Sequence, residues 1–309
     1  MKMRWAGVMP ATTTAFDEGL NVDHGFVAKH AKWLIDNGCT GIVTPGSLGE
    51  SATLGFEEKV AIWKTIIDAV GERVPVVAAI ASLSTAEGVQ LATRAAEVGC
   101  SGLMVLPPYV YRSDWREMKA HIEAVFRATR LSCMLYNNPV SYGTDFMPEQ
   151  IAELTRDHEN FEAVKESSTD VRRVTWIREL TGDRLAICVG VDDAIVEGIA
   201  MGAVGWIAGL VNALPKESVD LFNYAMNGER EQAMALYNWF LPLLRMDTVP
   251  KFVQLIKLVQ QEVGMGNARV RPPRLELEGE ELEQAVRTIR EALANQPENV
   301  SRKGAKAQS

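Results

Sequence analysis

Residues 161–170, Phe161-Glu-Ala-Val-Lys-Glu-Ser-Ser-Thr-Asp170, pass from a short apolar run into polar residues that often begin a helix. This pattern predicts a strand that ends at Lys165 and a helix after it. A primary amine at the mouth of an apolar sheet is poorly solvated, which favours the neutral form that can attack a ketone and form a Schiff base. Taken alone, the segment is better explained by an ordinary solvated lysine, so the rest of the chain decides between the two interpretations.

The reverse transition, from the end of a helix into a strand, recurs along the chain. Gly38-Cys-Thr-Gly-Ile42, Gly99-Cys-Ser-Gly-Leu103 and Gly202-Ala-Val-Gly-Trp206 each lead from a helix end through glycine into an apolar run. Short apolar runs alternate with amphipathic segments, which is typical of repeated β-α units. The expected strands are 7–13, 40–44, 74–81, 102–106, 132–137, 162–165, 185–190 and 205–208. The helices expected between them are 23–37, 56–70, 85–98, 113–128, 148–156, 170–180 and 192–201.

Eight such units predict an α/β protein, a (β/α)8 TIM barrel with extra C-terminal helices. A doubly wound open sheet is the second choice, but no Gly-x-Gly-x-x-Gly motif follows the first expected strand. We expect the barrel in residues 1–225, a helical extension packed on the barrel in 226–296, and a disordered tail in 297–309. Within the extension, a helix break is expected near Pro242 and another near Pro250.

Composition indicates which partners to expect. The chain has 309 residues, of which 47% are hydrophobic and 23% charged, and its net charge is -8. This acidic balance argues against nucleic-acid and membrane partners and favours small molecules. The four cysteines lie far apart without ligand spacing, so we expect buried thiols in a reducing compartment. Because no apolar run has the length of a signal peptide or a membrane span, we expect a cytoplasmic enzyme.

Metal and phosphate chemistry are poorly supported. His24, His30, His121 and His158 fall on expected helices or just after one, not at strand ends. No glycine-rich donor loop for phosphate follows the last two expected strands. We therefore expect no metal and no cofactor.

In a barrel of this kind, chemistry lies where the strands end. The second expected strand runs into Gly46-Ser-Leu-Gly-Glu-Ser51, whose glycines let backbone N–H groups point at a carboxylate, although an ordinary glycine turn explains it equally well. The fourth and fifth strands run into Tyr109 and Tyr136, and the sixth ends at Lys165. Schiff-base chemistry on a 2-oxo acid needs such a set: an amine, hydroxyl groups that relay protons, and donors for a carboxylate.

In combination these motifs resemble the dihydrodipicolinate synthase and N-acetylneuraminate lyase family of class I Schiff-base aldolases. The family's GxxGE loop stands as Gly46-Ser-Leu-Gly-Glu50, its YNxP as Tyr136-Asn-Asn-Pro139, its lysine in Lys165-Glu166, and its GxD as Gly190-Val-Asp192. The resemblance covers nearly the whole chain. It implies a small 2-oxo or 2-imino acid as substrate and a homotetramer built as a dimer of dimers.

The resemblance also implies a role for each site residue. Lys165 would form the imine, and Tyr136 would act as the general acid and base over it. Ser47 would supply a relay hydroxyl, and Tyr109 would take the place of a tyrosine that reaches across from a neighbouring subunit in many relatives. The substrate-binding residues implied by the same motifs are Leu48, Gly49, Asn138, Ser141, Gly190 and Ile207.

Two departures from the family pattern bear on the substrate. Ser141 stands where the synthases carry an arginine that clamps a second carboxylate, and Leu48 stands where the family usually has a carboxylate-binding threonine. A pocket for one carboxylate is therefore expected, and a role in lysine biosynthesis is not.

Among the branches of the family, the motifs most resemble enzymes that deaminate 1-pyrroline-4-hydroxy-2-carboxylate to 2,5-dioxopentanoate. The segments that carry this likeness are the Gly46–Glu50 loop, the run from Tyr136 to Gly143, Gly190-Val-Asp192, and Gly209-Leu-Val-Asn-Ala-Leu-Pro-Lys-Glu217. A pyruvate-releasing aldolase and a condensation like that of dihydrodipicolinate synthase are the alternative reactions. A barrel that binds a 2-oxo acid without turning it over is the alternative of another class.

Overall fold

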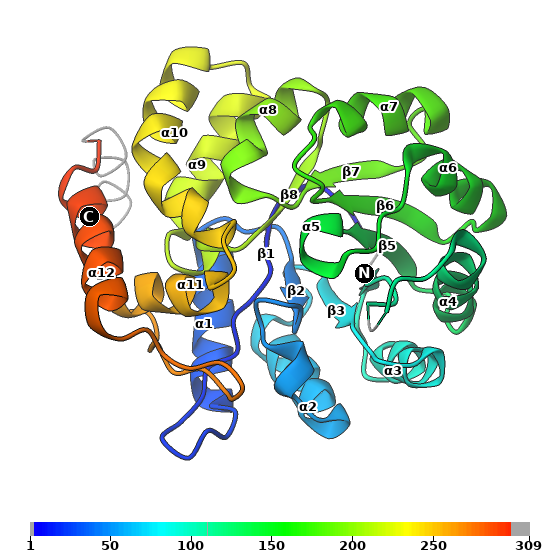
Figure 1. Ribbon diagram of the computed structural model, residues 1–309, viewed down its shortest axis with the longest axis horizontal. Coiled ribbons are helices and arrows are strands. Elements are labelled where there is room, and N and C mark those ends of the chain that lie inside the picture. Colours follow the sequence, from blue (N-terminus) through cyan, green and yellow to red (C-terminus); the bar gives the residue numbers. More distant parts are fainter. Residues whose placement is uncertain (1–2, 110, 298–309) are drawn as a thin grey trace.

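The computed structural model describes residues 3–109 and 111–297. Eight parallel strands curve into a barrel that is surrounded by helices (Figure 1). The strands neighbour one another in the order β1-β8-β7-β6-β5-β4-β3-β2, and a bridge between Ala11 and Val43 joins the two ends of this series. The predicted TIM barrel is confirmed. Its strands are β1 (Gly7–Pro10), β2 (Ile42–Thr44), β3 (Val76–Ile80), β4 (Gly102–Val105), β5 (Ser132–Asn137), β6 (Phe161–Glu166), β7 (Ala186–Val189) and β8 (Gly205–Ala208).

Each helix expected between two strands is present. These helices are α1 (His24–Asp36), α2 (Phe56–Val70), α3 (Thr85–Glu97), α4 (Trp115–Arg127), α6 (Pro148–Asp157), α7 (Arg172–Thr181) and α8 (Ile195–Ala200). Beyond β8 follow α9 (Pro215–Met226), α10 (Arg230–Leu244), α11 (Phe252–Glu262) and α12 (Gly279–Ala294). The 3-10 turns are η1 (Ser51–Thr53), η2 (Asp192–Ala194), η3 (Leu210–Asn212) and η4 (Arg245–Asp247). The short helix α5 (Pro139–Tyr142) was not predicted; it begins where the Asn138 side chain accepts a hydrogen bond from the Ser141 N–H.

Two helices start later than predicted. Helix α4 begins two residues late because the Asp114 carboxylate accepts a 2.9 Å hydrogen bond from the Glu117 N–H. Helix α7 begins at Arg172, after a turn in which Asp170 accepts from the Arg172 N–H, and its cap residue Val171 makes no side-chain cap. Strand β6 also runs one residue past Lys165, so the lysine is its penultimate residue.

Side chains on the strands alternate between two cores. Met9, Met104, Met134 and Ala163 belong to the cluster inside the barrel. The residues that alternate with them along the same strands pack against the helices. Because alternate residues of a strand share a face, Lys165 points to the same side as Ala163, into the barrel. The four cysteines are buried free thiols, as predicted.

The C-terminal helices differ from prediction at Pro242. This proline lies inside α10 and does not end the helix. Its missing N–H falls in the last turns of the helix, where the fully buried Phe240, Leu243 and Leu244 keep the chain packed. Helix α12 contacts both α10 and α11 on one side of the barrel (Figure 1). The division at residue 226 stays a prediction, and the predicted tail falls, from residue 298 on, outside the described residues.

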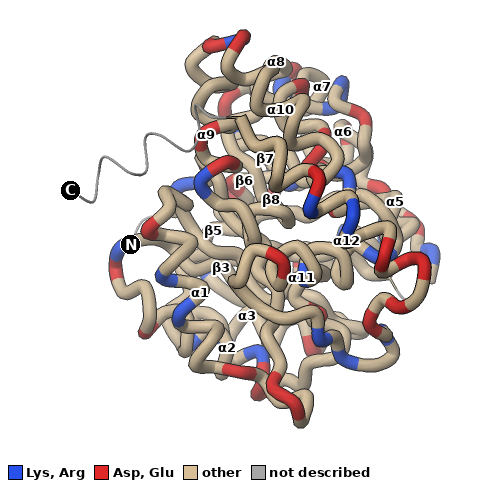
Figure 2. The backbone as a smooth tube through the Cα atoms, turned by 90° about the vertical axis from the view of Figure 1, so that its left-hand side faces the viewer, with Lys and Arg blue, Asp and Glu red and all other residues tan. Residues whose placement is uncertain are grey.

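Lys and Arg are interspersed with Asp and Glu along the outer helices and loops (Figure 2). None of the helices in residues 3–109 and 111–297 combines the length and the apolar character needed to span a lipid bilayer.

Candidate active site

A cavity of about 480 Å³ lies at the carboxyl ends of the strands. Most of the predicted site residues come together in its wall, namely Lys165, Tyr136, Ser47, Tyr109, Leu48, Asn138, Ser141, Gly190 and Ile207. Gly49 does not line the cavity; a Cβ at this position would overlap the Thr12 carbonyl oxygen and crowd Pro45. The cavity therefore collects residues from several different strand ends, as the position of an active site in this fold requires.

Lys165 and Tyr136 form the centre of the cavity. Both side chains are 6% exposed, and the two residues are register partners on β6 and β5. The Lys165 Nζ atom lies 4.1 Å from the centroid of the Tyr136 ring. The Asn138 amide donates a 2.9 Å hydrogen bond to the Tyr136 hydroxyl oxygen, so the hydroxyl proton is left free for a substrate. Gly190 is needed here, because a Cβ at this position would overlap the Lys165 side chain.

A buried polar network holds the ends of β5 and β6. The Glu166 carboxylate accepts from the Asn137 amide at 3.1 Å and from the Ser168 N–H at 2.7 Å. Burial raises the pKa of Glu166, and these hydrogen bonds oppose the rise. Asn137 also donates to Asp145, which pairs with Arg173 at 2.6 Å. Since Glu166 follows Lys165 directly, this network fixes the strand that carries the lysine.

Three hydroxyl groups extend from Tyr136 across the cavity. Ser47 Oγ is hydrogen-bonded to the hydroxyl of Tyr142, a residue for which the sequence predicted no role. The Tyr142 ring packs against Tyr109 at 5.4 Å and edge-on against Tyr136 at 5.9 Å, between centroids. Burial raises the pKa values of Tyr142 and Tyr109, so both phenols are proton donors at neutral pH. Tyr109 reaches the cavity of its own chain.

A buried ion pair anchors the Gly46–Glu50 loop to helix α11. Glu50 Oε1 lies 2.8 Å from Lys257 Nζ on α11, and the two side chains are 0% and 2% exposed. The second Glu50 oxygen accepts from the Arg271 N–H at 2.9 Å. Burial lowers the pKa of Lys257, and Glu50 opposes this effect. Glu50 therefore positions the loop and is not available to a substrate.

Other residues in or beside the cavity were not predicted as site residues. Asp247 and Arg274 reach its wall from η4 and from the segment before α12, parts of the chain that were expected only to pack on the outside. The Ser167 hydroxyl is buried and has no hydrogen-bond partner among the described residues. Asp192 lies beneath the cavity, and its carboxylate accepts from Trp206 Nε1 and the Leu210 N–H. Burial raises the pKa of Asp192 to about 6.

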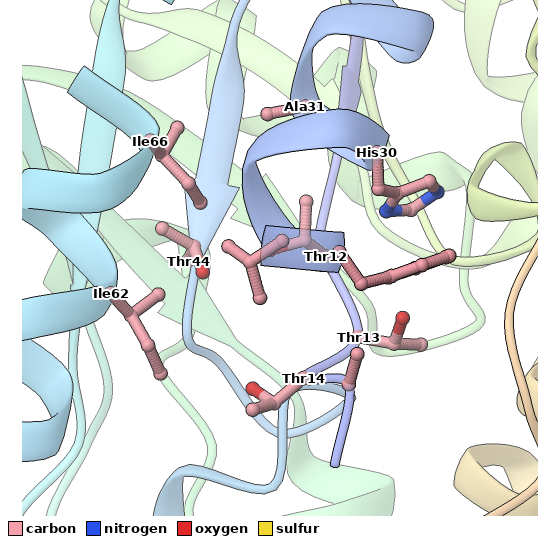
Figure 3. A pocket seen from close by; sticks show the side chains of 11 residues that line it. Thr12, Thr13, Thr14, His30, Ala31, Thr44, Ile62 and Ile66 are labelled. Atoms are coloured by element: carbon pink, nitrogen blue, oxygen red, sulfur yellow. The ribbon is translucent and has the colours of Figure 1, made fainter. Parts of the chain in front are cut away.

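A second cavity, of about 10 Å³, lies between α1 and the segment after β1 and has room for at most one water molecule. Figure 3 shows Thr12, Thr13, Thr14 and His30 around it. His30 Nε2 donates a 2.8 Å hydrogen bond to the Asn212 carbonyl, and burial lowers the pKa of His30 to about 4. This histidine packs the fold, as predicted. Within the part of the chain that the structure describes, no three His, Cys, Asp or Glu side chains converge as metal ligands would.

Comparisons with known proteins agree with this geometry. The Dihydrodipicolinate synthetase family matches residues 4–292. The 4-hydroxy-tetrahydrodipicolinate synthase of Geobacter metallireducens is 33% identical over 231 residues, which cover 75% of this chain and 79% of that protein. The synthase of Haloarcula marismortui is 31% identical over 289 residues, 93% of this chain and 92% of the other.

Solved structures show the same likeness. A dihydrodipicolinate synthase from Bacillus anthracis superposes with a TM-score of 0.89 at 30% identity, over 96% of this chain and 99% of the other. A prophage protein of the dihydrodipicolinic acid synthase family from E. coli K12, solved in complex with pyruvate, gives a TM-score of 0.87 at 26% identity, over 93% and 98%.

Proposed function

The chain belongs to the dihydrodipicolinate synthetase family and is a class I Schiff-base lyase, and from this premise we propose that Lys165 binds a small 2-oxo or 2-imino acid as an imine. The single observation that carries this proposal is the amine of Lys165, which lies in the wall of a substrate-sized cavity, 4.1 Å from the centroid of the Tyr136 ring. A buried amine beside a phenol has what imine formation needs: a nucleophile and a group that can move its protons.

Each neighbouring group has a role in this proposal. Tyr136 gives its proton to the group that leaves the carbinolamine and takes it back in the next step. Ser47, with Tyr142 and Tyr109, relays protons between Tyr136 and solvent. The backbone at Ser47 and Leu48 binds the carboxylate next to the reacting carbon, and Asn138, Ser141, Gly190 and Ile207 bound the rest of the substrate.

For the specific reaction we propose deamination of 1-pyrroline-4-hydroxy-2-carboxylate to 2,5-dioxopentanoate. Lys165 would displace the ring nitrogen by transimination, the 4-hydroxyl would leave as water, and hydrolysis of two imines would release product and ammonia. The net reaction consumes one water molecule. Ser141 and Leu48 support this choice. Ser141 provides no side-chain cation for a second carboxylate, and Leu48 provides no threonine hydroxyl, which leaves the pocket drier.

A second reaction is favoured by the relatives. The curated ones are named 4-hydroxy-tetrahydrodipicolinate synthases, and one structural neighbour was solved with pyruvate. Arg274 also lines the cavity, so a cation is available to a distal carboxylate. These observations support an aldolase or a synthase-like condensation that passes through a pyruvate imine on Lys165.

Product analysis separates the two reactions. Incubation with 1-pyrroline-4-hydroxy-2-carboxylate should give ammonia and 2,5-dioxopentanoate, whereas an aldolase should release pyruvate and an aldehyde from a 4-hydroxy-2-oxo acid. Release of pyruvate alone would overturn the deaminase proposal and leave the lysine imine in place. Absence of any product and of any imine would favour the non-catalytic binding barrel.

We further propose that the chain assembles as a homotetramer, a dimer of dimers. Sedimentation should then give four times the mass of one chain. Because Tyr109 lies in the cavity of its own chain, a monomeric species would still contain all of the hydroxyl groups named above.

A further inference from the structure

We propose that the Asp247 carboxyl group protonates the hydroxyl that leaves C4 of the substrate, while the substrate is held as an imine on Lys165. This inference rests on the proposed Schiff-base function and assigns to Asp247 a step that the barrel residues do not provide.

Asp247 is placed to serve a bound substrate. It ends η4, and its carboxyl group lies directly against Gly209, the residue after β8, where any Cβ would overlap it. Among the described residues that line the cavity, Asp247 is the one with a carboxyl group. Its side chain has no ion pair or hydrogen bond with any residue in 3–109 or 111–297.

The neighbouring acid shows the opposite arrangement. Asp192 is fully buried, and its two oxygens accept from Trp206 Nε1 and from the N–H groups of Gly209 and Leu210. Both oxygens of Asp192 are therefore hydrogen-bonded within the fold, and this residue of η2 serves to hold the end of β8 in place. Asp247 is therefore the acid whose oxygens are left for a substrate.

The surroundings favour the protonated form of Asp247. Burial raises the pKa of its carboxyl group, the negative charges of Asp192 and Asp193 raise it further, and the positive charge of Lys165 opposes them. Arg245, on the same turn, lies 3.8 Å from Asp193 and partly neutralises that residue. A carboxyl group whose neutral form is favoured in this way is suited to donate a proton.

The three phenols that line the cavity have other roles in the proposed mechanism. Tyr136 is needed next to Lys165, where it takes the proton from C3, Tyr142 is hydrogen-bonded to Ser47, and Tyr109 belongs to the relay toward solvent. In the proposed step the C3–H bond breaks and its proton passes to the Tyr136 phenolate. The electron pair forms the C3–C4 double bond, the C4–O bond breaks, and the hydroxyl takes the Asp247 proton and leaves as water. Asp247 is left as a carboxylate beside the cationic imine.

The test compares Asp247→Asn with Asp183→Asn, which makes the same exchange at a 97% exposed carboxylate in the loop that leads into β7, at the opposite end of the barrel from the cavity. Turnover of 1-pyrroline-4-hydroxy-2-carboxylate by Asp247→Asn should fall at least about 100-fold in kcat, with KM changed by less than about threefold. Asp183→Asn should stay near the wild-type rate. Borohydride trapping of pyruvate, which has no leaving group at C4, should be equal in all three proteins.

A pH profile adds a readout that a structural role would not change. Wild-type kcat should fall on the alkaline side as Asp247 ionises, and this limb should be absent from the residual activity of Asp247→Asn. Asp247→Ser, which is smaller and cannot clash with Gly209, should show the same loss of kcat and the same intact trapping.

The outcomes separate the inference from the proposed function. Wild-type turnover in Asp247→Asn, or equal loss of turnover and pyruvate trapping in both Asp247 variants, would overturn the inference. A wild-type protein that traps pyruvate but does not act on the hydroxypyrroline would overturn it as well, and would leave the lysine imine standing. A wild-type protein that traps nothing would remove the proposed function, and this inference with it.

Discussion

Tyr136 and Lys165 stand opposite each other on β5 and β6, and the Lys165 Nζ atom lies 4.1 Å from the centroid of the Tyr136 ring. The parallel register of these two strands brings the two side chains together. The phenol therefore shields the amine on one side and leaves the other side open to the cavity. The proposed imine chemistry depends on this pair.

Replacing Tyr136 by Phe should slow turnover and leave imine formation measurable. The ring that covers Lys165 is retained, but the hydroxyl that accepts from Asn138 and moves protons is lost. We expect kcat to fall by about 100-fold or more, while pyruvate is still trapped on Lys165 by borohydride. Equal rates for the wild type and Tyr136→Phe would remove Tyr136 from its proposed role.

Local patterns in the sequence were enough to predict the barrel and the residues at its strand ends. Lys165 could be placed because an apolar run, a turn and a helix start are all properties of adjacent residues. Asp247 and Arg274 could not be placed in this way. Both lie far beyond Lys165 in the chain, and helix propensity does not say over which end of the barrel a later segment folds.

Pro242 is a second case in which a local sequence signal did not predict the structure. A proline inside a helical pattern predicts a break, but burial of its neighbours decided the outcome. Tyr142 was missed because its partner Ser47 lies 95 residues away. Long-range packing therefore determined the helix boundary and completed the hydroxyl network.

Breaking the ion pair beneath the Gly46–Glu50 loop should destabilise the fold. Lys257→Met would leave the Glu50 carboxylate buried without its cation, and we expect a loss of about 3–5 kcal/mol in the free energy of unfolding. Urea denaturation followed by circular dichroism measures this change.

The matched control for Lys257 is Lys251→Met on the same segment. Lys251 pairs with Glu281 at the surface, where both side chains are 50% exposed, so its replacement should cost less than about 1 kcal/mol. If the two variants lost equal stability, burial would not be the reason for the effect at Lys257.

Stability should fall in acid because of His30. Its pKa is about 4 in the folded protein, against 6.5 for an exposed histidine, so the unfolded chain binds a proton first as the pH falls. Between pH 7 and pH 4 this linkage should remove up to about 3 kcal/mol from the free energy of unfolding. His30→Gln should flatten the slope of stability against pH, and His24→Gln, at the exposed start of the same helix, should keep it. An unchanged slope in His30→Gln would contradict this assignment.

Arg274 should select for a second carboxylate if one is bound. Among the described residues that line the cavity it is the cation other than Lys165. Arg274→Met should weaken binding of 2-oxoglutarate at least fivefold and leave 2-oxopentanoate, which lacks the terminal carboxylate, unchanged. Inhibition of pyruvate trapping by each acid measures the two affinities. Equal effects on both acids would show that Arg274 contributes no carboxylate contact.

The most direct test of the lysine imine is borohydride reduction in the presence of pyruvate, followed by peptide mass analysis. We expect that the peptide containing Lys165 gains the mass of one reduced pyruvate, that Lys165→Ala gains none, and that 1-pyrroline-4-hydroxy-2-carboxylate labels the same residue. A wild-type protein in which Lys165 carries no adduct from either compound would contradict the proposed imine.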